Sequence, residues 1–171
     1  MRALRILTAL IPATLLTALS AGADPTNPAQ SSSYYGSIRD WQVEALHVDG
    51  VFVGCRATIP LQPAGPLLLE RRDDAPGGWM LYLPVAGDTA GSANRGTLSI
   101  DDTERAALFR LLGHGWGAHG LSGSTRQQIA DGNYLTAAPE GAEPRQWILN
   151  GSTVALDMTQ ECFDRQGNAW R

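Results

Sequence analysis

Residues 41–59 read WQVEALHVDGVFVGCRATI and predict a β-hairpin. Two runs rich in β-forming residues, Trp41–Val48 and Val51–Ile59, flank Asp49-Gly50, a residue pair that tight hairpin turns favour. Apolar residues alternate with others in the second run, and this period of two places Cys55 on the apolar face of its strand. The pattern therefore directs the sulfur of Cys55 into the core, where a disulfide partner would have to lie.

The only other cysteine, Cys162, lies near the end of a predicted helix. Residues 152–153 offer a cap for this helix, and Ala155, Met158 and Cys162 recur at spacings of three and four, so they share one helix face. The two cysteines are far apart in sequence, unlike the close C-x-x-C pair of redox catalysts. We therefore predict a structural disulfide, Cys55–Cys162, formed in an oxidising compartment. Two free buried thiols, or an exchange-active pair, are the alternatives.

The start of the chain has the features of a secretory signal peptide. Two arginines among residues 1–5 precede an uncharged apolar run at residues 6–19, and Ala21-Gly22-Ala23 matches the small-x-small pattern of a cleavage site. A membrane-spanning helix would need about 20 apolar residues, and Pro12 lies inside this shorter run. We therefore expect a signal peptide at residues 1–23, cleaved after Ala23, and a periplasmic or secreted mature protein.

Short β-rich runs separated by Gly- and Pro-containing turns dominate the rest of the chain. They predict further strands at residues 67–71, 79–85, 97–101, 134–136 and 146–149. Ser124 is a candidate cap for a short helix ending near Ala130. Residues 102–112 fit either a helix or a strand, because periodicity does not decide so short an apolar run. We expect a disordered lead-in at residues 24–35 and one domain at residues 36–171. Its fold is predicted to be mainly β, a β-sandwich or partly open barrel with one or two short helices.

The charge balance excludes several classes of partner. Removing residues 1–23 takes away two of the 13 basic residues and none of the 17 acidic ones, so the mature chain is clearly acidic. We see no basic stripe and therefore expect no nucleic-acid partner, and no stable membrane insertion after cleavage. All 13 basic residues are arginines, so Schiff-base and phosphate-loop lysines are excluded. No cofactor is expected, and a protein or a glycan is the predicted kind of partner.

Read in order, several segments resemble the invasion-associated locus B family of exported bacterial proteins. The resemblance rests on a tryptophan strand near the start of the domain, then on LSIDD at residues 98–102, the stretch 109–118, GNYL at residues 132–135, and residues 147–156. It spans about residues 38–160, and the pair of cysteines typical of the family is missing from residues 111–116. The resemblance implies a β-sandwich-like exported domain that acts at the cell envelope or in host interaction. It implies no catalytic residues, and it favours a strand around Leu108 and Phe109.

Residues 113–120 read GHGWGAHG and form the most conspicuous local motif. His114 and His119 are candidate metal ligands, with Asp101, Asp102 or His47 completing a site. Five residues turn a helix through about 500°, which leaves the two rings roughly 140° apart. In a strand the two histidines would lie on opposite faces, about 17 Å apart along the chain. We therefore interpret the motif as a glycine-rich hairpin and predict no metal site.

Trp116 lies beside glycines that would expose it, and exposed tryptophans are frequent anchors of binding surfaces. The segment Gly120-Leu121-Ser122-Gly123 misses the G-x-S-x-G spacing of a serine nucleophile, so no catalytic residue is assigned. We interpret the chain as an exported, non-catalytic binding or interaction module with Trp116, His114 and His119 as its binding residues. The alternatives are a metal-dependent or His-based hydrolase that uses His114 or His119, and a periplasmic inhibitor of a secreted enzyme.

Overall fold

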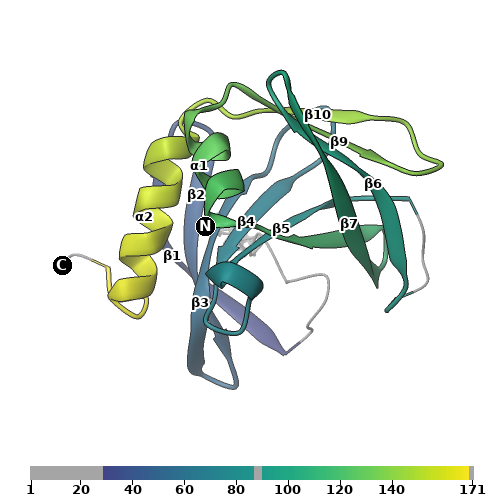
Figure 1. Ribbon diagram of the computed structural model, residues 1–171. Helices are drawn as coiled ribbons and strands as arrows, with labels where there is room; N and C mark the ends of the chain where they lie inside the picture. The colour runs from purple at the N-terminus through teal and green to yellow at the C-terminus, as the bar shows by residue number, and fades with distance from the viewer. Residues whose placement is uncertain (1–28, 87–89, 170–171) are drawn as a thin grey trace, which may run out of the picture.

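The computed structural model describes residues 29–86 and 90–169, and the predicted signal peptide, residues 1–23, lies outside them. The described residues form ten strands, two α-helices and one 3-10 helix (Figure 1). In chain order the elements are β1 (Gln30–Ile38), β2 (Trp41–Val48), β3 (Val51–Ile59), β4 (Leu67–Arg71), η1 (Pro76–Gly78), β5 (Trp79–Pro84), β6 (Ala93–Ile100), β7 (Thr103–Gly113), β8 (Trp116–Gly120), α1 (Gly123–Asp131), β9 (Tyr134–Pro139), β10 (Arg145–Ile148) and α2 (Ser152–Asp164).

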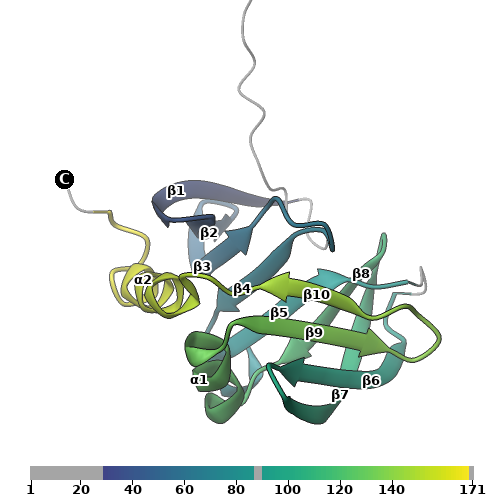
Figure 2. The same ribbon diagram turned by 90° about the horizontal axis from the view of Figure 1, so that it is seen from above.

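The strands make one antiparallel sheet in the order β1-β2-β3-β4-β5-β8-β7-β6-β9-β10. Strands β1 to β5 pair with one another in chain order. After β6 and β7, strand β8 returns to pair with the free edge of β5, and β9 then pairs with β6. The sheet curls so that β9 and β10 come across from β5 (Figure 2). The edge strands β1 and β10 do not pair with each other, so the sheet is not closed into a barrel. The mainly β fold with two short helices is confirmed.

The predicted hairpin at residues 41–59 and the predicted disulfide are both present. Asp49 and Gly50 have φ angles of 51° and 78°, the left-handed conformations that a tight turn between twisted strands requires. Cys55 and Cys162 are fully buried and bonded, with their Cα atoms 6.1 Å apart. Because Cys162 lies on α2, the bond fastens the last helix to β3, and α2 also packs on β2 (Figure 1).

Both helix starts differ from their predicted positions by one or two residues. The N-cap of α1 is Ser122, whose hydroxyl accepts a hydrogen bond from the Thr125 amide, and not Ser124. The N-cap of α2 is Gly151, and the Ser152 and Thr153 hydroxyls donate to the Ala130 carbonyl instead. These two hydroxyls thus tie the start of α2 to the end of α1, a tertiary use that local capping patterns do not indicate.

Two other expectations about the chain are settled by strand pairing. Of residues 102–112, all but the turn residue Asp102 belong to a strand, β7, which pairs with β6 on one side and β8 on the other. Residues 30–35, predicted as part of a disordered lead-in, lie in β1, which pairs with β2 from Gln30 onwards. That prediction was wrong because backbone hydrogen bonds to a neighbouring edge need no apolar side chains. Residues 24–28 lie outside the described residues.

The core lies inside the curl of the sheet and under α2. Trp41, Trp79 and Trp147, expected in the core from their strand positions, are at most 5% exposed. Neither α-helix of the described ranges has the length and apolarity that a bilayer crossing requires.

A buried ion pair lies on the face of β3 and β4 opposite the disulfide. Arg56 and Glu70 are direct cross-strand partners, and each is 1% exposed. The Nε atom of Arg56 lies 2.7 Å from Oε1 of Glu70, and Arg72 approaches the second carboxylate oxygen at 3.7 Å. Both charged groups lose their hydration because they are buried. The ion pair between them is the main interaction that compensates for this loss.

We expect replacement of both cysteines by alanine to lower the free energy of unfolding by about 2–5 kcal/mol, because the bond closes a long loop in the unfolded chain. Urea titration of the double variant measures this. Wild-type protein under reducing conditions should match the variant to within about 1 kcal/mol. Equal stability of oxidised wild type and variant would contradict the structural role of the disulfide.

The ion pair generates a second expectation. Glu70→Leu should cost about 3–5 kcal/mol, because it leaves the Arg56 guanidinium buried without its carboxylate. The double variant Arg56→Met/Glu70→Leu should regain most of this loss, since an apolar pair needs no compensation. Urea titrations of the three proteins decide the matter, and a double variant as unstable as the single one would show that the pair is not the relevant unit.

Candidate functional site

Residues 113–120 form a hairpin, as predicted, but the structure does not bring its two histidines together. His114 occupies the turn with a φ of 53° and is exposed. His119 lies in β8, where its Nδ1 atom is 3.0 Å from the Leu108 carbonyl oxygen and its ring is 5.7 Å from that of Phe109. Within residues 29–86 and 90–169 no group of three or more His, Cys, Asp or Glu side chains is placed to hold a metal ion.

Asp101, the carboxylate considered with these histidines, has a structural role. Its side chain accepts hydrogen bonds from the backbone amides of Asn133 and Tyr134, at 3.0 and 2.9 Å. These bonds hold the start of β9 beside the end of β6. These hydrogen bonds therefore occupy the Asp101 carboxylate.

Trp116 is half-buried rather than exposed. It pairs with Pro84 of β5 and with Gly113 of β7, and alternation along β8 places it on the same face as Ala118 and Gly120. Its side chain lines none of the pockets described below. The neighbouring glycines therefore do not leave the indole fully exposed, as the sequence suggested they would.

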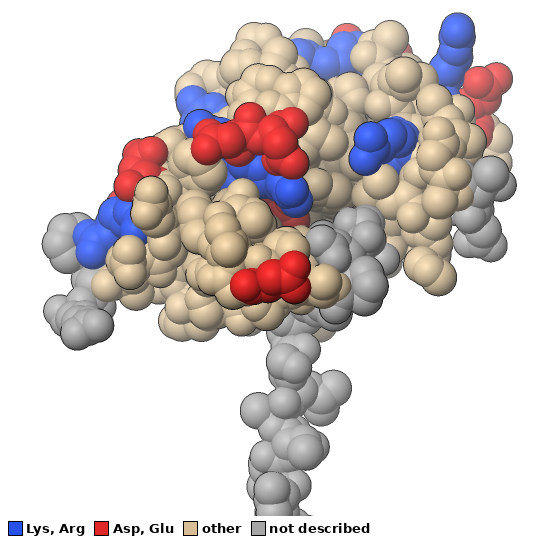
Figure 3. Space-filling model, turned by 90° about the horizontal axis from the view of Figure 1, so that it is seen from below, with Lys and Arg blue, Asp and Glu red and all other residues tan. Residues whose placement is uncertain are grey.

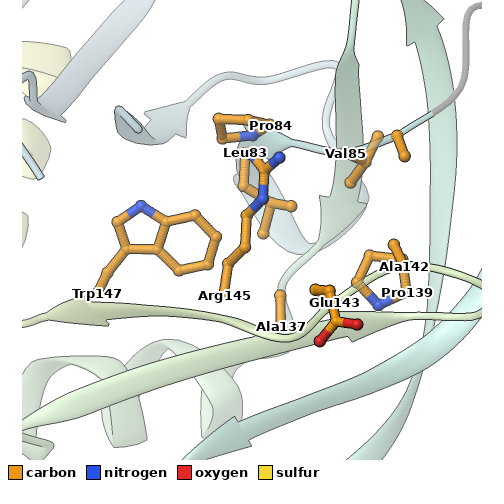
Figure 4. A pocket seen from close by; sticks show the side chains of 10 residues that line it. Leu83, Pro84, Val85, Ala137, Pro139, Ala142, Glu143, Arg145 and Trp147 are labelled. Carbon is orange, nitrogen blue, oxygen red and sulfur yellow. The ribbon is translucent and has the colours of Figure 1, made fainter. Parts of the chain in front are cut away.

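An enclosed pocket lies at the open end of the curled sheet, between the end of β5 and the hairpin of β9 and β10 (Figure 4). We call it the end pocket. Its volume is about 230 Å³. Its lining is almost wholly apolar and consists of Leu83, Pro84, Val85, Ala86, Ala137, Pro139, Ala142, Glu143, Arg145 and Trp147.

Strand alternation explains how these side chains come together. On β5, Leu81 and Leu83 point into the core, and Val85 continues the same row. On β10, Arg145 and Trp147 are two residues apart and therefore project from the same face. Trp147 is fully buried, so Arg145, one step nearer the open end, stands over the mouth of the pocket (Figure 4).

Arg145 is the one cation that lines the end pocket among the described residues. Its side chain extends across the pocket toward Leu83 and Pro84, whereas the Glu143 carboxylate turns away from the centre (Figure 4). No hydrogen bond or ion pair joins the Arg145 guanidinium to another described residue. Most described arginines are held by such contacts, for example Arg39 by Asn150, Arg105 by Thr125, and Arg71 by Gln160. The Arg145 guanidinium is thus available to a ligand.

A wider groove continues from the end pocket on the outer side of β10. Its volume is about 610 Å³, and it shares Pro84 and Arg145 with the end pocket. Its other lining residues are Pro63, Ala64, Gly65, Pro144 and Gln146. We call it the β10 groove. The indole Nε1 of Trp147 donates to the Gly65 carbonyl at 2.8 Å and so fixes the distance between β10 and the β3–β4 loop.

A third depression, of about 790 Å³, lies over the outer face of β5, β7 and β8. Met80, Tyr82, Leu108 and Arg110 contribute to it, so the 113–120 hairpin borders it through Ala118 and Gly120. At its rim Arg72 binds Asp74 with two hydrogen bonds of 2.8 and 3.0 Å, which lower the pKa of the Asp74 carboxyl. Figure 3 shows acidic and basic side chains in small mixed clusters on the underside of the molecule, among neutral surface.

The sequence did not indicate the end pocket. Its residues come from segments more than 50 positions apart, and most are alanines, prolines and valines without a chemical signature. One local signal exists, because Arg145 falls on the inward face of a strand whose next inward residue is a core tryptophan. A charged residue on the inward face of a strand indicates either the open end of a barrel-like sheet or a buried ion pair. Only the pairing of β9 with β6 shows that Arg145 lies at the open end.

We expect Trp147→Phe to lower the free energy of unfolding by about 1–3 kcal/mol, because the Gly65 carbonyl loses its donor while the ring stays apolar. Urea titration measures the change. Trp79→Phe is the matched control, since it also shortens a buried indole. A loss for Trp147→Phe no larger than for the control would show that the bond to Gly65 does not brace this end of the sheet.

No family model, curated protein or solved structure matches this chain. The likeness to the invasion-associated locus B family accordingly stays a prediction, and the geometry of the end pocket and the β10 groove carries the argument about function.

Proposed function

We propose that this protein is an exported, non-catalytic binding module that receives an apolar group of its partner in the end pocket. The observation that carries this proposal is an apolar cavity at the open end of the sheet with one unpaired guanidinium across it. Ligand sites of curled sheets commonly lie in their mouths, lined by apolar side chains with few polar groups. This combination fits recognition of a group by burial and charge.

Export is supported by the disulfide. Cys55–Cys162 is buried and joins two segments of the core, and such bonds persist in oxidising compartments. The signal peptide predicted at residues 1–23 accounts for entry into that compartment. We therefore place the protein in the periplasm or outside the cell, in agreement with the envelope role that the family resemblance implies.

The apolar lining and the small size of the end pocket favour a protein partner over a glycan. Apart from Arg145 and Glu143, the lining of the pocket is apolar and offers sugar hydroxyls few hydrogen-bond partners. Full burial of one aliphatic side chain contributes roughly 1.5–3 kcal/mol, whereas a micromolar complex needs about 8 kcal/mol. The partner must therefore make contacts beyond the pocket, as a polypeptide lying on the surrounding surface does.

The proposal predicts that a small neutral apolar molecule enters the end pocket. In an NMR titration, 3-methylbutanamide should shift the resonances of Leu83, Val85 and Ala137 at millimolar concentration. Ala142→Phe should abolish these shifts, because the added ring fills the cavity from its loop side.

Ala93→Phe is the matched control, since it places the same ring on an exposed alanine of β6 outside the pocket, and it should leave the shifts intact. Shifts that cluster on the 113–120 hairpin, or that survive Ala142→Phe, would show that the end pocket is not the binding site.

A further inference from the structure

We propose that the end pocket and the β10 groove together bind the C-terminal residue of an extended polypeptide. Its apolar side chain fills the end pocket, its terminal carboxylate pairs with Arg145, and its main chain runs along the β10 groove. This inference rests on the proposed function and specifies the partner of the same site.

Three features meet at one place, the boundary marked by Pro84 and Arg145. The enclosed cavity lies on one side of this boundary, the open groove on the other, and the guanidinium between them. The Cα atom of a C-terminal residue carries three groups: an apolar side chain, a carboxylate and the preceding main chain. A pocket, a cation and a groove that share two residues match these three groups one to one.

The volume of the end pocket suits one side chain better than a whole ligand. Pockets for small molecules usually measure about 300–1,000 Å³. The end pocket is smaller, at about 230 Å³, and the rest of the site is open surface. An aliphatic side chain fits the cavity, and what it is attached to must leave through the β10 groove.

The edge of β10 offers backbone pairing to an extended chain. Tyr134 exchanges hydrogen bonds with Asp101 on the β6 side of β9, so Leu135 and Ala137 face β10 and bond Trp147 and Arg145. The amide and carbonyl of Gln146 must then point away from β9, toward the β10 groove. The Ile148 amide, which has the same parity, confirms this direction by donating to the Gln62 side chain at 3.4 Å.

A carboxylate is the anion that this arrangement favours. The planar guanidinium of arginine binds a carboxylate through two parallel hydrogen bonds. Without a ligand the guanidinium has no partner among the described residues, so binding breaks no existing ion pair.

The test uses hexapeptides of glycine, serine and threonine that end in alanine, valine, leucine or phenylalanine, labelled with fluorescein at the N-terminus. Each is made as the free acid and as the C-terminal amide, and fluorescence anisotropy measures its dissociation constant. We expect the valine or leucine acid to bind at least about tenfold tighter than its amide, the usual effect of losing a charge-assisted hydrogen bond. Arg145→Gln should remove that difference.

Arg110→Gln is the matched control, because Arg110 is also exposed and lies in the depression on the other face of the sheet. It should leave the preference for the free acid unchanged. Hexanoate and N-acetylvaline, added as competitors, distinguish a peptide end from a free carboxylic acid, and a peptide site requires that the hexapeptide bind more tightly than either.

Equal affinity for acid and amide would overturn the role of the carboxylate while leaving binding of 3-methylbutanamide, and thus the proposed function, intact. Tighter binding of hexanoate than of any hexapeptide would overturn the polypeptide partner and assign a free acid. Absence of all binding, including that of 3-methylbutanamide, would remove the proposed function as well.

Discussion

The covalent and packing contact between α2 and the first half of the sheet is the constraint on which the rest of the structure depends. The bond between Cys55 and Cys162 fixes the last helix over β2 and β3, the two strands that follow β1 in the chain. The chain must therefore return from β10 to this place, which holds β9 and β10 across the curl from β5. The end pocket lies where β9 and β10 face β5 without pairing with it as strands.

The interior of the curled sheet and its open end are lined by different side chains. The interior is filled by large side chains, with Trp41 and Trp147 fully buried. Toward the open end the lining changes to alanine and proline, and the space left by these small residues is the end pocket. The Trp147 indole both closes the core and braces the β3–β4 loop, so one side chain separates the packed core from the binding surface.

Charged side chains are also arranged differently on the outer face of the sheet and at its open end. On the outer face of β3 and β4, Arg56 and Glu70 form a fully buried ion pair, and Arg72 is held by Asp74 at the surface. These arginines are thus already engaged with carboxylates. Arg145 differs because its strand neighbour on the inward face is the Trp147 indole, and because Glu143 turns away from it (Figure 4). An unpaired cation at the mouth of an enclosed apolar pocket is the chemical feature of this surface.

The sequence by itself determined the hairpin at residues 41–59, the inward direction of Cys55 and Cys162, most strands and the core position of three tryptophans, because alternation, turn pairs and helix periodicity are local. It did not determine β1, whose Ser-rich strand exists through pairing with β2, or β7, whose short apolar run fits two periods. Only the tertiary structure decided the return of β8 to β5 and the position of β10, since backbone pairing between distant strands leaves no local pattern. The end pocket is assembled from exactly such distant pieces, so its location followed from strand order alone.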